Sequence, residues 1–161
     1  MTTATVTRSH GMGAWIGFVL LCNAAGFVSA LIGGDPRFYQ ELAQPSWAPP
    51  PWLFGPVCTA LYTLMGTATF LVWDRTSGRA RRTALTIFGV QLAINVLWTP
   101  VFFGLHSVGG GLVVIALVLV SVIAMLVVYA RRLPLAGALV APLAVWVAFA
   151  TALNAAIYAL N

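Results

Sequence analysis

Five long apolar segments, separated by short polar or glycine-rich stretches, make up most of the chain. They cover residues 13–32, 53–74, 83–103, 112–129 and 135–160. A helix of about 20 residues spans a hydrocarbon core of about 30 Å, since each residue adds about 1.5 Å. The pattern predicts an all-α protein, an integral membrane bundle of five transmembrane helices. We assign residues 1–12 as a disordered cytoplasmic N-terminus and residues 13–161 as one membrane domain.

The longest connection between apolar segments runs from Gly33 to Pro51 and contains a cluster of prolines and tryptophans. Proline fixes φ and lacks an N–H group, so the run 49–51 cannot lie inside a helix. We expect a stiff, extended strap that presents Trp47 and Trp52. Two interpretations fit this strap: an aromatic anchor at the headgroup level, or a lid over a ligand site between the helices.

Composition supports a membrane location, because 61% of the residues are hydrophobic and only 7% are charged. Soluble domains carry about 25% charged residues. The basic residues, all arginine, lie beside the predicted spans, which indicates membrane topology and not nucleic-acid binding. In a five-span topology, one side of the membrane receives every arginine except Arg37. The positive-inside rule therefore predicts a cytoplasmic N-terminus, with the C-terminus and the Gly33–Pro51 connection outside.

Polar side chains at bilayer depth are the most informative ones, because lipid offers them no partners. Gln91 and Asn95 are four residues apart, so they share one face of the third helix, which Trp98 and Phe102 continue. Amides in membrane spans commonly join helices. Alternatively, amides and aromatic residues on one stripe line a pocket for a small molecule. The residues alone leave both interpretations open.

The sequence contains no pattern typical of catalysis or metal binding. We find no nucleophile–base pair, phosphate-binding loop or metal-ligand spacing, and His10 and His106 lie outside the spans. Cys22 and Cys58 both fall in apolar segments. We therefore assign no catalytic residue, no metal site and no required cofactor. Small-residue pairs, Gly13 with Gly17 and Gly89 with Ala93, are candidate contacts between helices or between copies of the chain.

Three separated blocks carry a family resemblance: FYQELAQPSWAPPPWLFGPVCTALYTLMG at 38–66, QLAINVLWTPVFFG at 91–104 and WVAFATALN at 146–154. Together they closely resemble the TspO/MBR family, the tryptophan-rich sensory proteins related to the mitochondrial translocator protein. The resemblance implies a bacterial inner-membrane protein, often dimeric, that binds protoporphyrin IX, haem and related hydrophobic ligands in a pocket capped by the connection between helices 1 and 2.

The candidate ligand-binding residues come from the resemblance, together with Cys58 and Tyr62, which lie on one stripe of the second helix. They are Tyr39, Pro45, Trp47, Ala48, Cys58, Tyr62, Asn95, Trp98, Phe102, Trp146, Phe149, Ala150 and Leu153.

The chain departs from the family pattern at three positions. Cys58 stands where the family usually has a tryptophan, Leu143 stands where it has a tyrosine, and no basic residue follows Tyr158. In some bacterial members that tryptophan is associated with light-dependent porphyrin breakdown. The resemblance implies a receptor or sensor for tetrapyrroles, with porphyrin breakdown, transport of porphyrins or sterols, and a scaffold role in stress signalling as alternatives. Cys58 makes an enzymatic role less expected than binding.

Overall fold

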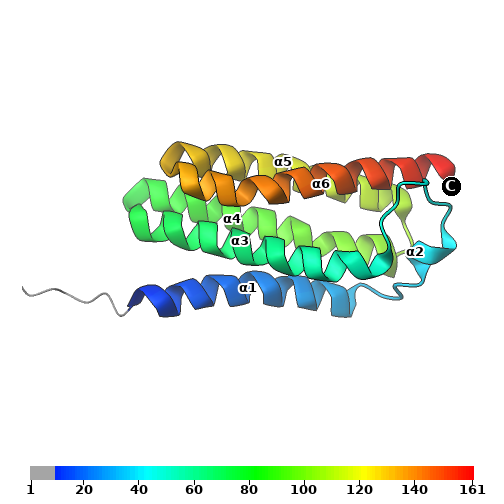
Figure 1. Cartoon of the computed structure of the whole chain (residues 1–161), viewed down its shortest axis with the longest axis horizontal. Coiled ribbons are helices and arrows are strands. Elements are labelled where there is room, and N and C mark those ends of the chain that lie inside the picture. The colour runs from blue at the N-terminus through cyan, green and yellow to red at the C-terminus, as the bar shows by residue number, and fades with distance from the viewer. Residues whose placement is uncertain (1–9) are drawn as a thin grey trace, which may run out of the picture.

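A computed structural model describes residues 10–161 of the chain, so nine of the residues assigned to a disordered N-terminus lie outside it. Five long helices lie side by side in an up-and-down bundle, α1 at one edge (Figure 1). In chain order the elements are α1 (His10–Ile32), α2 (Phe38–Glu41), the 3₁₀ turn η1 (Pro51–Leu53), α3 (Phe54–Arg75), α4 (Gly78–Thr99), the π-helical turn η2 (Pro100–Gly104), α5 (Val108–Arg132) and α6 (Pro134–Leu160). The predicted all-α, five-span architecture is confirmed.

The helices are longer than the apolar pattern indicated. The expected polar linker at 75–82 is mostly helical, because α4 begins at Gly78 after an extended Ser77. Glycines 109–111 belong to the first turn of α5, where the Ser107 side chain accepts a hydrogen bond from the Gly110 N–H group. Pro100 ends the α-helical part of its span, as expected, but the chain continues as a π turn. The apolar pattern missed these ends because polar caps and arginines extend helices beyond the membrane core.

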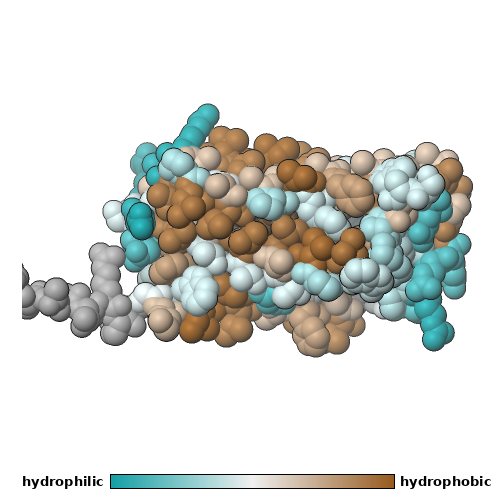
Figure 2. All heavy atoms as spheres, in the orientation of Figure 1, coloured by the Kyte–Doolittle hydropathy of each residue, from teal (hydrophilic) through white to brown (hydrophobic). Residues whose placement is uncertain are grey.

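The outer surface of the bundle is apolar along the spans. Figure 2 shows hydrophobic side chains across the middle of the molecule and hydrophilic groups gathered at both ends. Five helices are long and apolar enough to cross a membrane, and many large hydrophobic side chains, Leu20 and Val120 among them, are exposed. Exposed apolar surface of this extent marks a membrane protein. The chain is an integral membrane protein.

The two ends of the bundle differ. One, which we call the arginine end, carries the α3–α4 and α5–α6 turns and the start of α1 (Figure 1). The other, which we call the α2 end, carries α2, η1 and Asn161. At the α2 end, the Phe38 ring packs edge-on against Phe102 and His106, at centroid distances of 5.7 and 4.6 Å. These contacts hold α2, which the sequence did not predict, against η2 and the turn that leads from η2 into α5.

Candidate functional site

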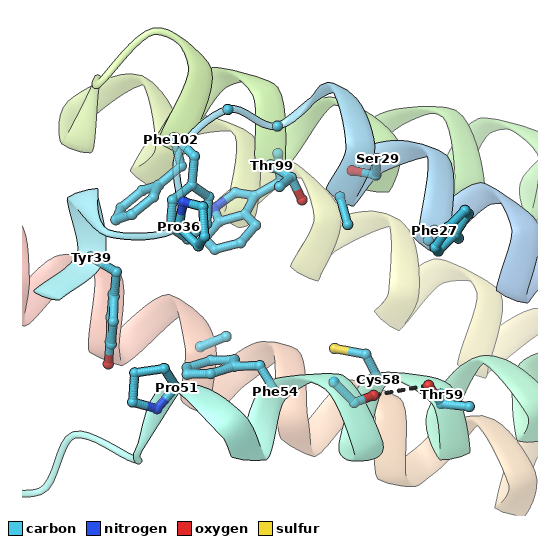
Figure 3. A pocket seen from close by; sticks show the side chains of 18 of the residues that line it. Phe27, Ser29, Pro36, Tyr39, Pro51, Phe54, Cys58, Thr59, Thr99 and Phe102 are labelled. Carbon is cyan, nitrogen blue, oxygen red and sulfur yellow. Dashed lines mark hydrogen bonds between the residues drawn. The ribbon is translucent and has the colours of Figure 1, made fainter.

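A cavity of about 520 Å³ lies between α1, α3, the α4–η2 junction and α6, beneath α2. In Figure 3 the labelled side chains of α1 and α3 face each other across this space. Phe27, which is 66% exposed, and Thr59 lie where the cavity meets the outer surface between the two helices. The cavity therefore opens sideways, toward the acyl chains of the bilayer, as well as lying under α2.

Glycines set the shape of this space by allowing α1 to approach its neighbours closely. A methyl group built on Gly66 of α3 would lie 2.8 Å from the Cα of Val19, and one on Gly26 of α1 would overlap the Tyr62 ring. Near the α2 end, α1 contacts α4 instead, since the Ser29 hydroxyl donates to the Val96 carbonyl at 2.8 Å. The cavity begins at Asn23 and Gly26 of α1 and extends from there toward the α2 end.

The structure brings seven of the thirteen predicted binding residues to the cavity. They come from α2, α3, the α4–η2 junction and α6, which confirms that these elements converge on one space. The seven are Tyr39, Cys58, Tyr62, Trp98, Phe102, Ala150 and Leu153. Their part in ligand binding stays a prediction.

Trp146, Phe149 and Asn95 do not line the cavity. The Trp146 ring packs edge-on against the Phe54 ring, with the ring centroids 5.8 Å apart. Phe54, and not Trp146, lines the cavity. Trp146 and Phe149 instead line a shallow depression of about 650 Å³ on the outer side of α3 and α6. Asn95 of α4 is absent from the cavity lining, whereas Trp98, three residues further along, belongs to it. A helical wheel places all three on the inner side of their helices, but the neighbouring helix covers them.

The proline strap contributes only its last residue, Pro51, to the cavity lining. Pro45, Trp47 and Ala48 are absent from its lining, and the Trp47 ring contacts Phe149 of α6 edge-on at 5.8 Å. The strap crosses the end of α6 because the Asn161 side chain binds the backbone of Ala43, accepting from its N–H group at 3.1 Å and donating to its carbonyl at 3.0 Å. The cover is formed by α2 and its flanks, with Pro36, Tyr39 and Pro51 against the cavity.

Several lining residues are absent from the list of candidate ligand-binding residues. Asn154, Phe54 and Ile157 face the cavity, as does one side of α1 with its small residues Gly26 and Ala30. Asn154 could have been found, because it lies four residues after Ala150 and is an amide at bilayer depth. The α1 face carried no such signal, since small residues in a span equally indicate helix packing.

The cavity lining is mostly apolar, and three of its residues carry a buried polar atom that has no hydrogen-bond partner. The Tyr39 hydroxyl, Trp98 Nε1 and Asn154 Oδ1 are buried without a hydrogen-bond partner. Burial raises the pKa of the Tyr39 phenol above its ordinary value of 10.0, so it stays a neutral hydroxyl at physiological pH. Asn23 also faces the cavity, but its amide donates to Val19 and Thr63.

Comparison with known proteins decides the family. The TspO/MBR family model matches residues 18–160. The chain belongs to the TspO/MBR family. It is 38% identical to a protein named CrtK of Rhodobacter capsulatus, over 89% of this chain and 90% of that protein. It is also 38% identical to the human translocator protein, over 86% of this chain and 85% of that protein. A third relative, the tryptophan-rich protein TspO of Chlorobaculum tepidum, is 37% identical over 88% of this chain and 91% of its own length.

In this TspO/MBR chain the cavity wall includes Cys58 of α3. Cys22 is fully buried and both thiols are free. Within residues 10–161, no group of three or more His, Cys, Asp or Glu side chains is placed to hold a metal ion. The site offers shape, aromatic surface and hydrogen-bonding groups, which are the properties of a binding pocket for a small molecule.

Proposed function

We propose that the cavity binds a tetrapyrrole, protoporphyrin IX or haem, and that the protein acts as a membrane receptor or sensor for it. The observation that carries this proposal is the apolar space of about 520 Å³ between the helices, walled by Phe54, Trp98 and Phe102. The Trp98 and Phe102 rings are stacked, with centroids 5.2 Å apart. A flat aromatic ligand packs well on such a surface, and membership in a family of tryptophan-rich sensory proteins supports it.

The lateral opening suits a ligand that partitions into lipid. Thr59 and Phe27 lie at the outer margin of the cavity, on helices whose other exposed side chains face the bilayer. A hydrophobic macrocycle dissolved in the membrane reaches the site without crossing the polar ends of the bundle. In this proposal the ligand enters from the bilayer, while α2, Pro36 and Pro51 cover the end of the site.

The proposal includes an orientation in the bacterial inner membrane. Six arginines of the described chain are at the arginine end, in or beside the α3–α4 and α5–α6 turns, whereas Arg37 is at the α2 end, with Asp35 and Glu41. The positive-inside rule then places the arginine end in the cytoplasm and the α2 end outside. We also propose a homodimer, which is supported by the open surface beside Gly13 and Gly17 of α1 and beside Gly89 of α4.

Titration of the purified protein with protoporphyrin IX, followed by absorbance and tryptophan fluorescence, tests the proposal. We expect saturable binding that Trp98→Ala weakens by roughly tenfold or more, because a fully contacted aromatic wall is lost. Trp52→Ala is the matched control, since Trp52 is 71% exposed on η1 and does not line the cavity. Equal binding by wild type and Trp98→Ala would place the ligand elsewhere, and the absence of any saturable binding would refute the function.

A further inference from the structure

The shallow depression between α3 and α6 is a groove on the membrane-facing side of the bundle. On α6 it is lined by one stripe of residues, three and four positions apart, and on α3 by Val57 and Leu61. None of these residues lines the cavity, so the groove is a separate feature. The α6 stripe consists of Ala138, Ala141, Pro142, Val145, Trp146 and Phe149.

The groove has the length of one leaflet of the membrane. Ala138 and Phe149, its outermost residues on α6, are roughly 16 Å apart along a helix that rises about 1.5 Å per residue. Each leaflet contributes about 15 Å to a hydrocarbon core of about 30 Å. With α6 centred in the membrane, Ala138 lies near the edge of the core and Phe149 lies near the midplane. The groove therefore follows the path of an acyl chain in one leaflet.

The groove runs toward the arginine end, where both of its walls meet arginines. Arg75 is the last residue of α3, and Arg131 and Arg132 are the last residues of α5, directly before α6. All three are exposed. Of the three acidic residues in the chain, only Asp74 is at this end. An anionic headgroup is therefore favoured at the end of the groove where a lipid of that leaflet has its phosphate.

The type of basic residue fits a phosphate. All basic residues of the chain are arginine and none is lysine, although either type satisfies the positive-inside rule. The planar guanidinium group donates two parallel hydrogen bonds to a phosphate, which a lysine cannot do. Arg81 is held by the protein itself, over the Trp73 ring at 5.1 Å and with Nε donating to the Thr76 carbonyl at 2.8 Å. It is not part of the phosphate site.

We propose that the groove binds an anionic phospholipid, phosphatidylglycerol, from the leaflet at the arginine end. Its phosphate contacts Arg75, Arg131 and Arg132, and one acyl chain lies along residues 138–149 of α6. Phosphatidylcholine has the same chains, but its headgroup carries a cation that opposes the arginines. This lipid site is independent of the tetrapyrrole cavity, so either proposal stands if the other fails.

Quenching of Trp146 by brominated acyl chains measures which lipid occupies the groove. The protein is placed in phosphatidylcholine nanodiscs that contain a small fraction of chain-brominated phosphatidylglycerol or phosphatidylcholine. Trp146→Phe identifies the share of the quenching that belongs to Trp146. The relative affinity for phosphatidylglycerol should be roughly tenfold or more, because each arginine near the headgroups favours an anionic lipid. Equal quenching by the two brominated lipids would overturn the inference.

Two pairs of arginines give a charge-matched comparison at the same end of the bundle. Arg131→Gln/Arg132→Gln should lower the preference for phosphatidylglycerol by roughly fivefold or more. Arg79→Gln/Arg82→Gln removes the same charge from α4, which contributes no residue to the groove. It should change the preference by less than about twofold in physiological salt, which screens charges more than about 8 Å apart. Equal losses in both variants would indicate general attraction of this end for anionic lipid and would overturn the site.

A second pair of variants tests the apolar part of the site. Ala138→Phe places a ring in the groove next to the arginines, and it should weaken the quenching of Trp146 by brominated phosphatidylglycerol roughly threefold or more, since the chain loses its contact with α6. Ala148→Phe is the control, because Ala148 is on the same helix outside the groove. Both alanines are exposed, so neither variant disturbs the core. Unchanged quenching in Ala138→Phe would show that the chain does not lie in the groove.

Discussion

Cys58 and Cys22 illustrate how one residue type takes different environments within the same bundle. Cys58 lines the cavity on α3, whereas Cys22 on α1 is fully enclosed by the main core. Figure 3 shows the Cys58 sulfur directed into the space between α1 and α3. Cys58 is thus a chemical reporter for the cavity, and Cys22 an internal control of the same type.

We expect a membrane-permeant maleimide to label Cys58 faster than Cys22, because only the Cys58 sulfur faces space that the reagent can enter. Mass spectrometry of the single-cysteine variants Cys22→Ser and Cys58→Ser gives the two rates separately. Saturating protoporphyrin IX should slow the labelling of Cys58 by roughly tenfold or more, since a ligand bound to most of the protein excludes the reagent. Equal rates for the two cysteines would contradict the placement of Cys58 in the cavity wall.

At the scale of an element, α1 is the helix whose position defines the cavity. It meets α3 closely at Gly66, where Val19 and the Phe18 carbonyl leave no room for a side chain, and it meets α4 at Ser29. Much of its remaining surface is exposed, including Leu20 and Leu31. A few close contacts therefore determine how far α1 stands from α3.

Gly66→Ala should push α1 away from α3. The added methyl group would lie 2.8 Å from the Val19 Cα and 2.9 Å from the Phe18 carbonyl oxygen, both backbone atoms that cannot turn aside. We expect a loss of about 1–3 kcal/mol of stability, typical of overpacking, measured as a lower melting temperature in detergent. Gly11→Ala is the control, because nothing lies within 4 Å of its Cβ position and alanine favours a helix by about 0.5–1 kcal/mol. A Gly66→Ala protein as stable as Gly11→Ala would argue against this close contact.

At the scale of the whole molecule, the spans could be predicted from the sequence, but the pairing of their faces could not. The apolar segments gave five helices, and the spacing of Trp98 and Phe102 placed both toward the interior. The same reasoning failed for Trp146, because a helical wheel does not show that Phe54 of another helix stands in front of it. The path of the strap depends on a contact between residues 118 positions apart, which local patterns do not carry.

That contact closes the α2 end of the molecule. Asn161 binds both backbone groups of Ala43 and also donates to the Ile157 carbonyl at 2.8 Å, so one side chain joins the strap to the last turn of α6. The strap is otherwise held by few polar contacts, among them the Gln44 side chain on the Tyr39 carbonyl. Because Tyr39 covers the cavity, release of Ala43 should loosen the cover as well as the strap.

Asn161→Leu should therefore speed both opening of the strap and loss of the ligand. Removing two hydrogen bonds to Ala43 costs about 1–3 kcal/mol of local stability. Where the strap recloses faster than the exposed amide exchanges, this corresponds to roughly five- to 150-fold faster amide exchange at Ala43. Hydrogen exchange in nanodiscs measures this rate directly, and stopped-flow release of protoporphyrin IX measures the effect on the site.

Asn161→Asp is the graded comparison, because its carboxylate still accepts from the Ala43 N–H group but no longer donates to the Ala43 carbonyl. The exchange rate of Ala43 in this variant should therefore fall between the rates in the wild type and in Asn161→Leu. If Asn161→Leu left exchange at Ala43 unchanged, the strap would be held by its prolines and by the Trp47 contact with Phe149 instead.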